Sequence, residues 1–215
     1  MVNIYLQENG IMKREEKNQQ TRRRILESAL AEFAEQGYGA SSVNTISNGE
    51  GLSKGIIYHY FPTKDDLYLA CVEECFQMLT GHLQSHTNMV GQTAEERLEQ
   101  YFRVRLDFFE QNPQYQRIFC DAVIMPPAHL EASIQEKKAP FDRFNIDSLN
   151  RMLEPVSLRS DLSREDVVDT FRQYQDYINA RYQMTGSEKI DIRDHEESCR
   201  RALRILLYGV VERKE

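Results

Sequence analysis

A short segment of the chain carries side chains suited to contact with a DNA duplex: Lys54, Gly55, Ile56, Tyr58 and His59. A lysine reaches a base edge or a phosphate, and an isoleucine touches the methyl group of a thymine. A glycine lets the backbone approach closely, while tyrosine and histidine donate hydrogen bonds to phosphates. The chemistry that this segment indicates is recognition of double-stranded DNA.

Two short helices joined by a tight turn must position these side chains. Ser42 can cap a helix over residues 43–50, and Ser53 can cap a second helix over residues 54–60. The turn between them is Gly51-Leu52-Ser53. This arrangement predicts a helix-turn-helix, a motif whose second helix enters a major groove.

An earlier amphipathic helix, predicted over residues 19–36, offers the surface on which the two short helices pack. Its apolar residues recur at spacings of three and four, and Gly37 and Gly39 end it. We expect the core of this domain to join Ile25, Ala29 and Phe33 with Val43, Ile46, Leu52, Ile57 and Phe61.

Over about residues 21–72 the chain resembles the tetracycline-repressor (TetR) family of bacterial regulators. The resemblance lies in an ordered set of residues: Ile25, Ala29, Phe33, Gly37, Ile46, Gly51-Leu52-Ser53-Lys54-Gly55, Tyr58-His59-Tyr60-Phe61 and Lys64-Asp65-Asp66-Leu67. It implies a homodimer that binds a palindromic operator on double-stranded DNA.

The resemblance also implies a role for each DNA-binding residue. Ser41 and Ser42 match positions that hold backbone phosphates, and Lys54, Gly55, Ile56 and Tyr58 match positions that read the groove. Tyr58, His59 and Lys64 match phosphate-contacting positions, whereas Tyr60 and Phe61 look structural. The chain departs from the family at Ser47 and Glu50, where alanines are usual, and at Gly49, which costs about 1 kcal/mol within a helix.

Charge is unevenly distributed along the chain. The net charge of −7 and the isoelectric point of about 5.4 do not by themselves favour a nucleic-acid partner. Residues 1–64, however, carry eight Lys or Arg and seven Asp or Glu, and six of these basic residues lie between Lys13 and Arg24. Positive charge therefore gathers beside the helix-turn-helix.

The composition indicates a cytoplasmic protein. The four cysteines form no CxxC pair, and we expect them to be reduced and packed. No apolar run approaches the roughly 18 residues that a membrane span requires, so no membrane partner is expected. The N-terminus also lacks the apolar core of a secretory signal.

Helical periodicity continues through the rest of the chain and predicts an all-α fold. We expect a three-helix DNA-binding domain over residues 13–66, and a larger helical domain for effector binding and dimerisation over residues 67–215. The last two helices, predicted over 163–184 and 192–211, each carry an apolar face, and by the resemblance they pair across the dimer axis. Helices are also predicted over 64–86, 93–111 and 129–153, the last interrupted at Pro140.

Residues 93–182 combine many aromatic residues with scattered polar ones, which indicates an effector pocket for a small apolar or aromatic molecule. We expect a cavity of roughly 300 Å³ or more. The candidate ligand-binding residues are Phe102, Arg105, Phe109, Phe119, His129, Tyr174, Gln175 and Ile178.

Other chemistry finds little support in the sequence. Cys71, Cys75, His82 and His86 share one helix face, but they span about 22 Å, which is too far for one metal ion. A pair of them four residues apart, joined by ligands from elsewhere, stays open as an alternative. We interpret them as core residues and expect no metal and no cofactor. There is no Gly-rich phosphate loop, HExxH motif or nucleophile elbow, so we expect no enzyme.

The sequence thus predicts a DNA-binding transcriptional regulator, a repressor that a small molecule releases from its operator. Two alternatives stay open. One is a regulator controlled by a protein partner or by cysteine redox chemistry, without a small-molecule effector. The other is an enzymatic activity in the C-terminal domain.

Overall fold

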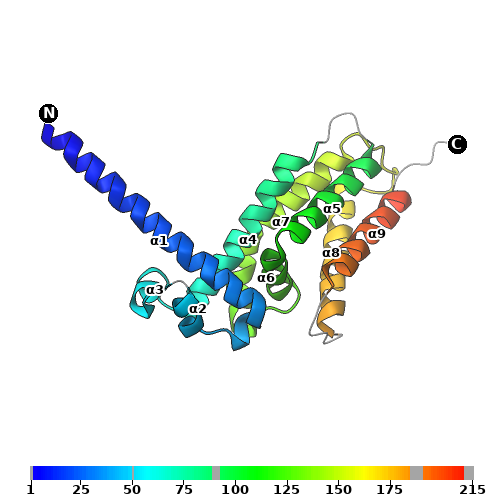
Figure 1. Ribbon diagram of the computed structural model, residues 1–215. Coiled ribbons are helices and arrows are strands. Elements are labelled where there is room, and N and C mark those ends of the chain that lie inside the picture. The colour runs from blue at the N-terminus through cyan, green and yellow to red at the C-terminus, as the bar shows by residue number, and fades with distance from the viewer. Residues whose placement is uncertain (1, 50, 89–92, 185–190, 211–215) are drawn as a thin grey trace. The chain divides into compact units, whose positions relative to one another are not determined.

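The computed structural model describes residues 2–49, 51–88, 93–184 and 191–210, and these residues are almost entirely helical (Figure 1). The all-α fold expected from the periodicity is confirmed. The elements are α1 (Val2–Ala40), α2 (Val43–Gly49), α3 (Lys54–Tyr60), α4 (Lys64–His86), α5 (Ala94–Gln111), α6 (Pro113–Val123), a 3₁₀ turn (Ala128–Leu130), α7 (Glu131–Leu153), α8 (Arg164–Met184) and α9 (Ile192–Val210). The chain divides into two compact units, Met1–Cys71 and Val72–Glu215. Among the described helices, none is long and apolar enough to cross a bilayer.

The core of the first unit lies between the second half of α1 and the two short helices. Ile25, Ala29 and Phe33 are fully buried there. The predicted partners from the short helices and their flanks are buried as well, except Leu52, which is half-buried; the buried ones are Val43, Ile46, Ile57 and Phe61. This packing confirms the predicted core and fixes α2 and α3 on α1.

Helix α1 differs from its prediction at both ends. It begins at Val2 instead of residue 19, because the residues before position 19 include no proline that would stop a helix. At Gly37 the backbone leaves the helix with φ 71° and ψ 168°, and one more turn then continues to Ala40. A positive φ of this kind favours glycine, so Gly37 breaks the helix as expected.

Hydrogen bonds from serine side chains define the starts of the two short helices. The Ser42 hydroxyl accepts from the backbone N–H of Asn44 at 3.1 Å, and the Ser53 hydroxyl accepts from Ile56 at 3.2 Å. The buried Glu32 carboxylate of α1 accepts the backbone N–H of Ser42 at 2.9 Å. Both predicted caps are therefore confirmed, and Glu32 additionally attaches the start of α2 to α1.

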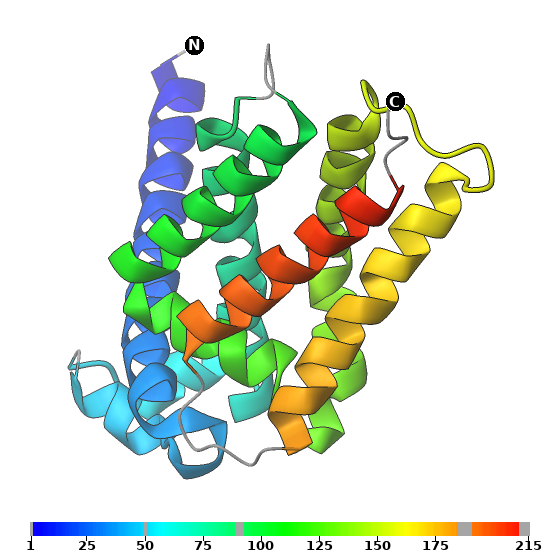
Figure 2. The ribbon, with the colours of Figure 1, turned by 90° about the vertical axis from the view of Figure 1, so that its right-hand side faces the viewer.

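In the second unit, α9 packs against both α5 and α8 (Figure 2). Helix α5 starts with a capping box in which Thr93 and Glu96 exchange hydrogen bonds. Helix α7 corrects one prediction, because it continues through Pro140 without an interruption. Pro140 and Glu136 are both exposed, so water can satisfy the carbonyl that loses its helical partner.

Candidate DNA interface and ligand cavity

Helix α3 presents one buried face and one free face. Ile57 is 1% exposed and anchors the helix, whereas Ile56 and Tyr58 are 41% and 46% exposed. Lys54, Gly55 and His59 are exposed as well. The structure therefore brings the five residues predicted on this helix onto one accessible surface.

Gly55 is not required by the protein's own packing. A methyl group at this position would meet only the Ser53 hydroxyl, at an ordinary 3.9 Å, and the backbone φ of Gly55 is not positive. The described part of the protein thus gives no steric reason for a glycine here. Close approach of a DNA backbone stays the predicted reason.

Lys64 lies in a polar cluster that joins the start of α4 to the end of α1. Its ammonium group donates to the carbonyl of Ser41 at 2.8 Å and lies 4.6 Å from the centre of the Tyr38 ring. The Tyr38 hydroxyl donates to the carboxylate of Asp65. Burial, the hydrogen bond to Asp65 and its charge raise the pKa of Tyr38 to about 12. An ammonium has three donors, so two remain on Lys64 for a phosphate.

The two serines before α2 differ in what they can offer DNA. Ser41 is 6% exposed, its hydroxyl donates to the carbonyl of Tyr38, and its backbone N–H donates to Gly37. Its donors are thus used inside the domain, which differs from the phosphate contact that the resemblance implied. Ser42 is half-buried, and its hydroxyl accepts the cap of α2 while keeping its own hydrogen for another acceptor.

The basic residues of α1 lie on an exposed part of the helix. Arg14, Lys17 and Arg22 are all exposed, and the guanidinium of Arg22 lies 5.2 Å from the ring centre of Phe61. Tyr60 at the end of α3 donates to Asn18 of the same helix. These contacts place positive charge of α1 next to the end of α3.

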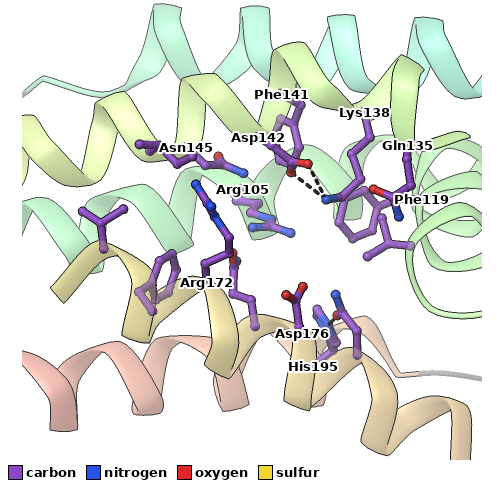
Figure 3. A pocket seen from close by; sticks show the side chains of 16 residues that line it. Arg105, Phe119, Gln135, Lys138, Phe141, Asp142, Asn145, Arg172, Asp176 and His195 are labelled. Carbon is purple, nitrogen blue, oxygen red and sulfur yellow. Dashed lines mark hydrogen bonds and ion pairs between the residues drawn. The ribbon is translucent and has the colours of Figure 1, made fainter. Parts of the chain in front are cut away.

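A cavity of about 350 Å³ lies among α5, α6, α7, α8 and the start of α9 (Figure 3). Its volume agrees with the expected minimum. Of the eight candidate ligand-binding residues, Arg105, Phe119 and Gln175 line this cavity. The structure thus brings together one candidate from each of α5, α6 and α8.

The other five candidates lie elsewhere. Phe102 and Phe109 are buried in the core, and His129 is exposed in the 3₁₀ turn. Tyr174 and Ile178 line a separate hollow of about 270 Å³ between α8 and α9. Side chains at neighbouring positions on a helix point about 100° apart. A cavity lined by Gln175 is therefore not also lined by both Tyr174 and Ile178.

Sequence reasoning missed the contribution of α7, which supplies several lining residues: Gln135, Lys138, Asp142 and Asn145, with Phe141 among them. The prediction gave most weight to aromatic residues and so passed over this mainly polar face. The recurrence of polar residues at spacings of three and four along one helix was the signal available.

Arg105 forms the floor of the cavity and pairs with Glu196 of α9, which is not itself among the lining residues. The Nε of Arg105 lies 3.1 Å from a carboxylate oxygen of Glu196, and each side chain is 3% exposed. Burial alone would lower the pKa of Arg105, but the charge of Glu196, followed by Tyr101, raises it on balance. His195 extends the floor, with Nε2 2.9 Å from the Asn179 amide oxygen and Nδ1 3.5 Å from Glu196.

Further contacts fix the groups around Arg105. Its guanidinium lies 5.1 Å from the ring centre of Phe119 and 5.7 Å from that of Phe141. The Tyr101 hydroxyl donates to the Asn145 amide oxygen at 2.5 Å, and burial raises the pKa of Tyr101 to about 12. On α7, Lys138 donates to both carboxylate oxygens of Asp142, at 2.6 and 2.7 Å (Figure 3).

The cysteines are buried packing residues, whereas the expected core position is wrong for the histidines of α4, because His82 is half-buried and His86 is exposed. All four cysteines are buried, and burial raises the pKa of the Cys120 and Cys199 thiols to about 12. His82 and His86 stack with ring centres 4.1 Å apart, and burial together with His86 lowers the pKa of His82. Among the described residues, no group of three His, Cys, Asp or Glu is arranged to hold a metal ion.

Helices α8 and α9 carry a set of exposed large apolar and aromatic side chains. Their exposed fractions range from 39% at Tyr174 to 88% at Met184. The others are Tyr177, Ile205 and Tyr208. Exposure of such an apolar surface to water is unfavourable for a lone subunit.

The sequence of the chain is similar to those of known transcriptional regulators. The family model described as "Bacterial regulatory proteins, tetR family" matches residues 25–71. The transcriptional repressor KstR2 of Mycobacterium tuberculosis is 28% identical over 169 residues, which cover 75% of this chain and 80% of that protein. The transcriptional regulator RutR of Escherichia coli is 28% identical over 96 residues, 45% of this chain and 44% of the relative.

Solved structures share the fold over nearly the whole chain. The transcriptional regulator FadR of Bacillus subtilis, in complex with stearoyl-CoA, matches with a TM-score of 0.64 at 18% identity. The match covers 87% of this chain and 98% of the FadR chain. A regulator from Saccharomonospora viridis in complex with choline has a TM-score of 0.65 at 17% identity, with 91% and 100% covered.

Proposed function

The chain belongs to the TetR family of bacterial transcriptional regulators, and from this premise we propose that it is a homodimeric repressor which a small molecule releases from a palindromic operator. The observation that carries the proposal is α3, a short helix anchored by buried Ile57 with Ile56 and Tyr58 exposed. A large apolar side chain held at an exposed position on a rigid helix suits the methyl-bearing edge of a base pair. The DNA-binding domain is assigned to residues 13–66 and the effector-binding and dimerisation domain to residues 67–215.

The contacts with DNA divide into two classes. Lys54, Gly55, Ile56 and Tyr58 read the major groove, because they share the exposed face of α3. Ser42, His59 and Lys64 hold backbone phosphates, and the basic residues of α1 add a sequence-independent attraction. Ser41 acts within the domain, since its hydroxyl and its backbone N–H are both used there.

The dimer forms through α8 and α9. Their exposed side chains, among them Tyr177 and Ile205 at 60% and 65%, become buried when a second copy packs against them. Two copies related by a twofold axis place two α3 helices in successive major grooves, which explains why the operator is palindromic.

Control by a small molecule is favoured by the cavity of the second unit. Its volume of about 350 Å³ lies within the range of ligand pockets. Two neighbours in fold are in complex with stearoyl-CoA and choline, so this architecture accommodates small molecules. The ligand acts by favouring a spacing of the two α3 helices that no longer fits successive grooves.

The two alternatives receive less support. Regulation by cysteine redox chemistry needs an accessible thiolate, whereas the cysteines are buried and the pKa values of Cys120 and Cys199 are raised. A family of DNA-binding regulators gives no basis for an enzymatic activity in the second unit.

The test is a binding titration of the purified protein with labelled DNA from the promoter of its own gene. We expect a specific complex whose affinity falls as salt rises. Lys64→Ala should lower the slope of log affinity against log salt by roughly one unit on every sequence, because it removes a phosphate contact. Lys54→Ala should instead change the preference at particular base pairs by about 1–3 kcal/mol.

Arg143→Ala is the matched control, since it removes one exposed positive charge from α7. It should leave the affinity and the salt slope near the wild-type values. The absence of a specific complex at low salt would refute the proposed function.

A further inference from the structure

The inner wall of the cavity is rich in hydrogen-bond donors. Arg105 has five N–H donors in a planar fork. Its Nε lies 3.1 Å from a Glu196 carboxylate oxygen, and the Arg105 side chain lines the cavity together with side chains from α7 and α8 (Figure 3). Because the Arg105 side chain is only 3% exposed, it offers a positive charge that is already removed from bulk water.

Two asparagines add amide donors beside this guanidinium. The Asn145 oxygen accepts from the Tyr101 hydroxyl, and the Asn179 oxygen accepts from His195 Nε2. The oxygen of each amide is therefore used within the protein, and its NH₂ group is turned to other partners. Both residues line the cavity together with Arg105.

Two acidic residues, Asp142 and Asp176, also line the cavity, but they are not the partners of these donors. Asp142 is paired with Lys138 at 2.6 Å on the α7 side. Asp176 and Arg172, which precedes it by one helical turn, are both exposed, and the Asp176 carboxylate points into the cavity (Figure 3). Two of the carboxylates near these donors, Glu196 and Asp142, are therefore paired with cations of the protein, and Asp176 is open to solvent.

Apolar surface adjoins the donors. The ring centres of Phe119 and Phe141 lie 5.1 and 5.7 Å from the Arg105 guanidinium, and Phe171 lines the cavity from α8. A volume of about 350 Å³ is at the small end of the range for ligand pockets, which suits a compact molecule better than a long chain.

We propose, on the basis of the function proposed above, that the effector is a compact organic anion. Its carboxylate or phosphate group binds Arg105 and the NH₂ groups of Asn145 and Asn179, and its apolar body packs against the phenylalanine rings. A charged acceptor makes shorter and stronger hydrogen bonds to a guanidinium than a neutral one does. The largely apolar effector expected from the sequence is thus replaced by one with a charged end.

Isothermal titration calorimetry with four probes of matched shape tests the charge preference. The probes are 3-phenylpropanoate, 3-phenylpropyl phosphate, 3-phenylpropanamide and 3-phenylpropylammonium. We expect an anion to bind about tenfold more tightly than the amide, since charge-assisted hydrogen bonds are roughly twice as strong as neutral ones. The ammonium should bind most weakly, because it would face the buried guanidinium. The tighter of the two anions identifies the acid group as carboxylate or phosphate.

Variants locate the preference at Arg105. The double variant Arg105→Met/Glu196→Met removes both charges, so that neither is left buried alone. It should fold and bind the anion no better than the amide. Arg103→Met is the matched control, because Arg103 is exposed on the same helix. It should keep the anion preference of the wild type.

Calorimetry without DNA separates this inference from the proposed function. Equal or tighter binding of the amide or the ammonium, or no binding of any probe at millimolar concentration, would overturn the anion proposal even if the protein binds its operator. Loss of the operator complex would instead overturn the proposed function. An anion preference that persists in the double variant would also contradict the proposal.

Discussion

Replacing one member of the Arg105–Glu196 pair should destabilise the protein far more than replacing both. In Arg105→Met, the Glu196 carboxylate stays buried without its cation, and in Glu196→Met the guanidinium stays buried without its anion. The double variant leaves neither charge in the core. Methionine fills the space of either long side chain with an adaptable apolar one.

The geometry sets the size of the effect. At 3.1 Å and an effective dielectric constant of about 20, the attraction between two unit charges is about 5 kcal/mol. The cost of removing both groups from water offsets most of this attraction, so the intact pair adds little net stability. Breaking it from one side should cost about 3–5 kcal/mol.

The two single variants should not be equal. Arg105→Met also removes the contacts of the guanidinium with the Phe119 and Phe141 rings, which adds about 1 kcal/mol. The double variant should lose no more than about 2 kcal/mol, because no unpaired charge remains. The losses of unfolding free energy in the two single variants should therefore sum to much more than the loss in the double variant.

Urea unfolding followed by circular dichroism, at one protein concentration for all four proteins, measures these differences. Equal slopes of unfolding free energy against urea would show that the same surface is exposed in each. Single variants that each cost less than about 1 kcal/mol, with a double variant equal to their sum, would refute the reasoning.

Four further predictions concern other parts of the chain. Because burial raises the pKa of Cys120 and Cys199 to about 12, iodoacetamide near neutral pH should label these thiols only after unfolding, and mass spectrometry of the folded protein showing rapid labelling would contradict this. Thr93→Ala should lower the stability measured by thermal unfolding by about 1 kcal/mol, because it removes the α5 cap. The backbone N–H and the hydroxyl of Thr93 lower the pKa of Glu96. The difference in stability between wild type and Glu96→Gln should therefore be present at neutral pH and disappear as the pH falls through that lowered pKa. Ile205→Glu should shift sedimentation from dimer toward monomer without lowering helicity, because this side chain is 65% exposed on α9, and an unchanged dimer would exclude α9 from the interface.

The DNA-binding domain could be predicted from the sequence because its signals are local. Ser42 and Ser53 precede their helices directly, and Gly51 has the positive φ of 63° that the turn requires. The buried position of Ile57 follows from the spacing of apolar residues around it. Each of these features depends on a few neighbouring residues, so the chain alone defines them.

The cavity could be anticipated only in outline, because the ion pair at its floor joins residues that are far apart in the chain. Arg105 occupies the apolar stripe of α5, between Phe102 and Phe109, and Glu196 occupies that of α9, before Cys199. One charge within an apolar stripe could equally reach solvent. Opposite charges within two such stripes indicate an ion pair between the two helices. That prediction also requires knowing that α5 and α9 are in contact.

The buried pair at the cavity floor also limits how the effector of such a regulator can change during evolution. A substitution of Arg105 or Glu196 alone would consume much of the roughly 5–15 kcal/mol that separates a folded domain from its unfolded chain. A lineage would rarely pass through that intermediate. Exposed rim residues such as Arg172 and Asp176 can be exchanged singly at little cost in stability. New ligand preferences should therefore accumulate first at the rim, with the floor inherited as a unit.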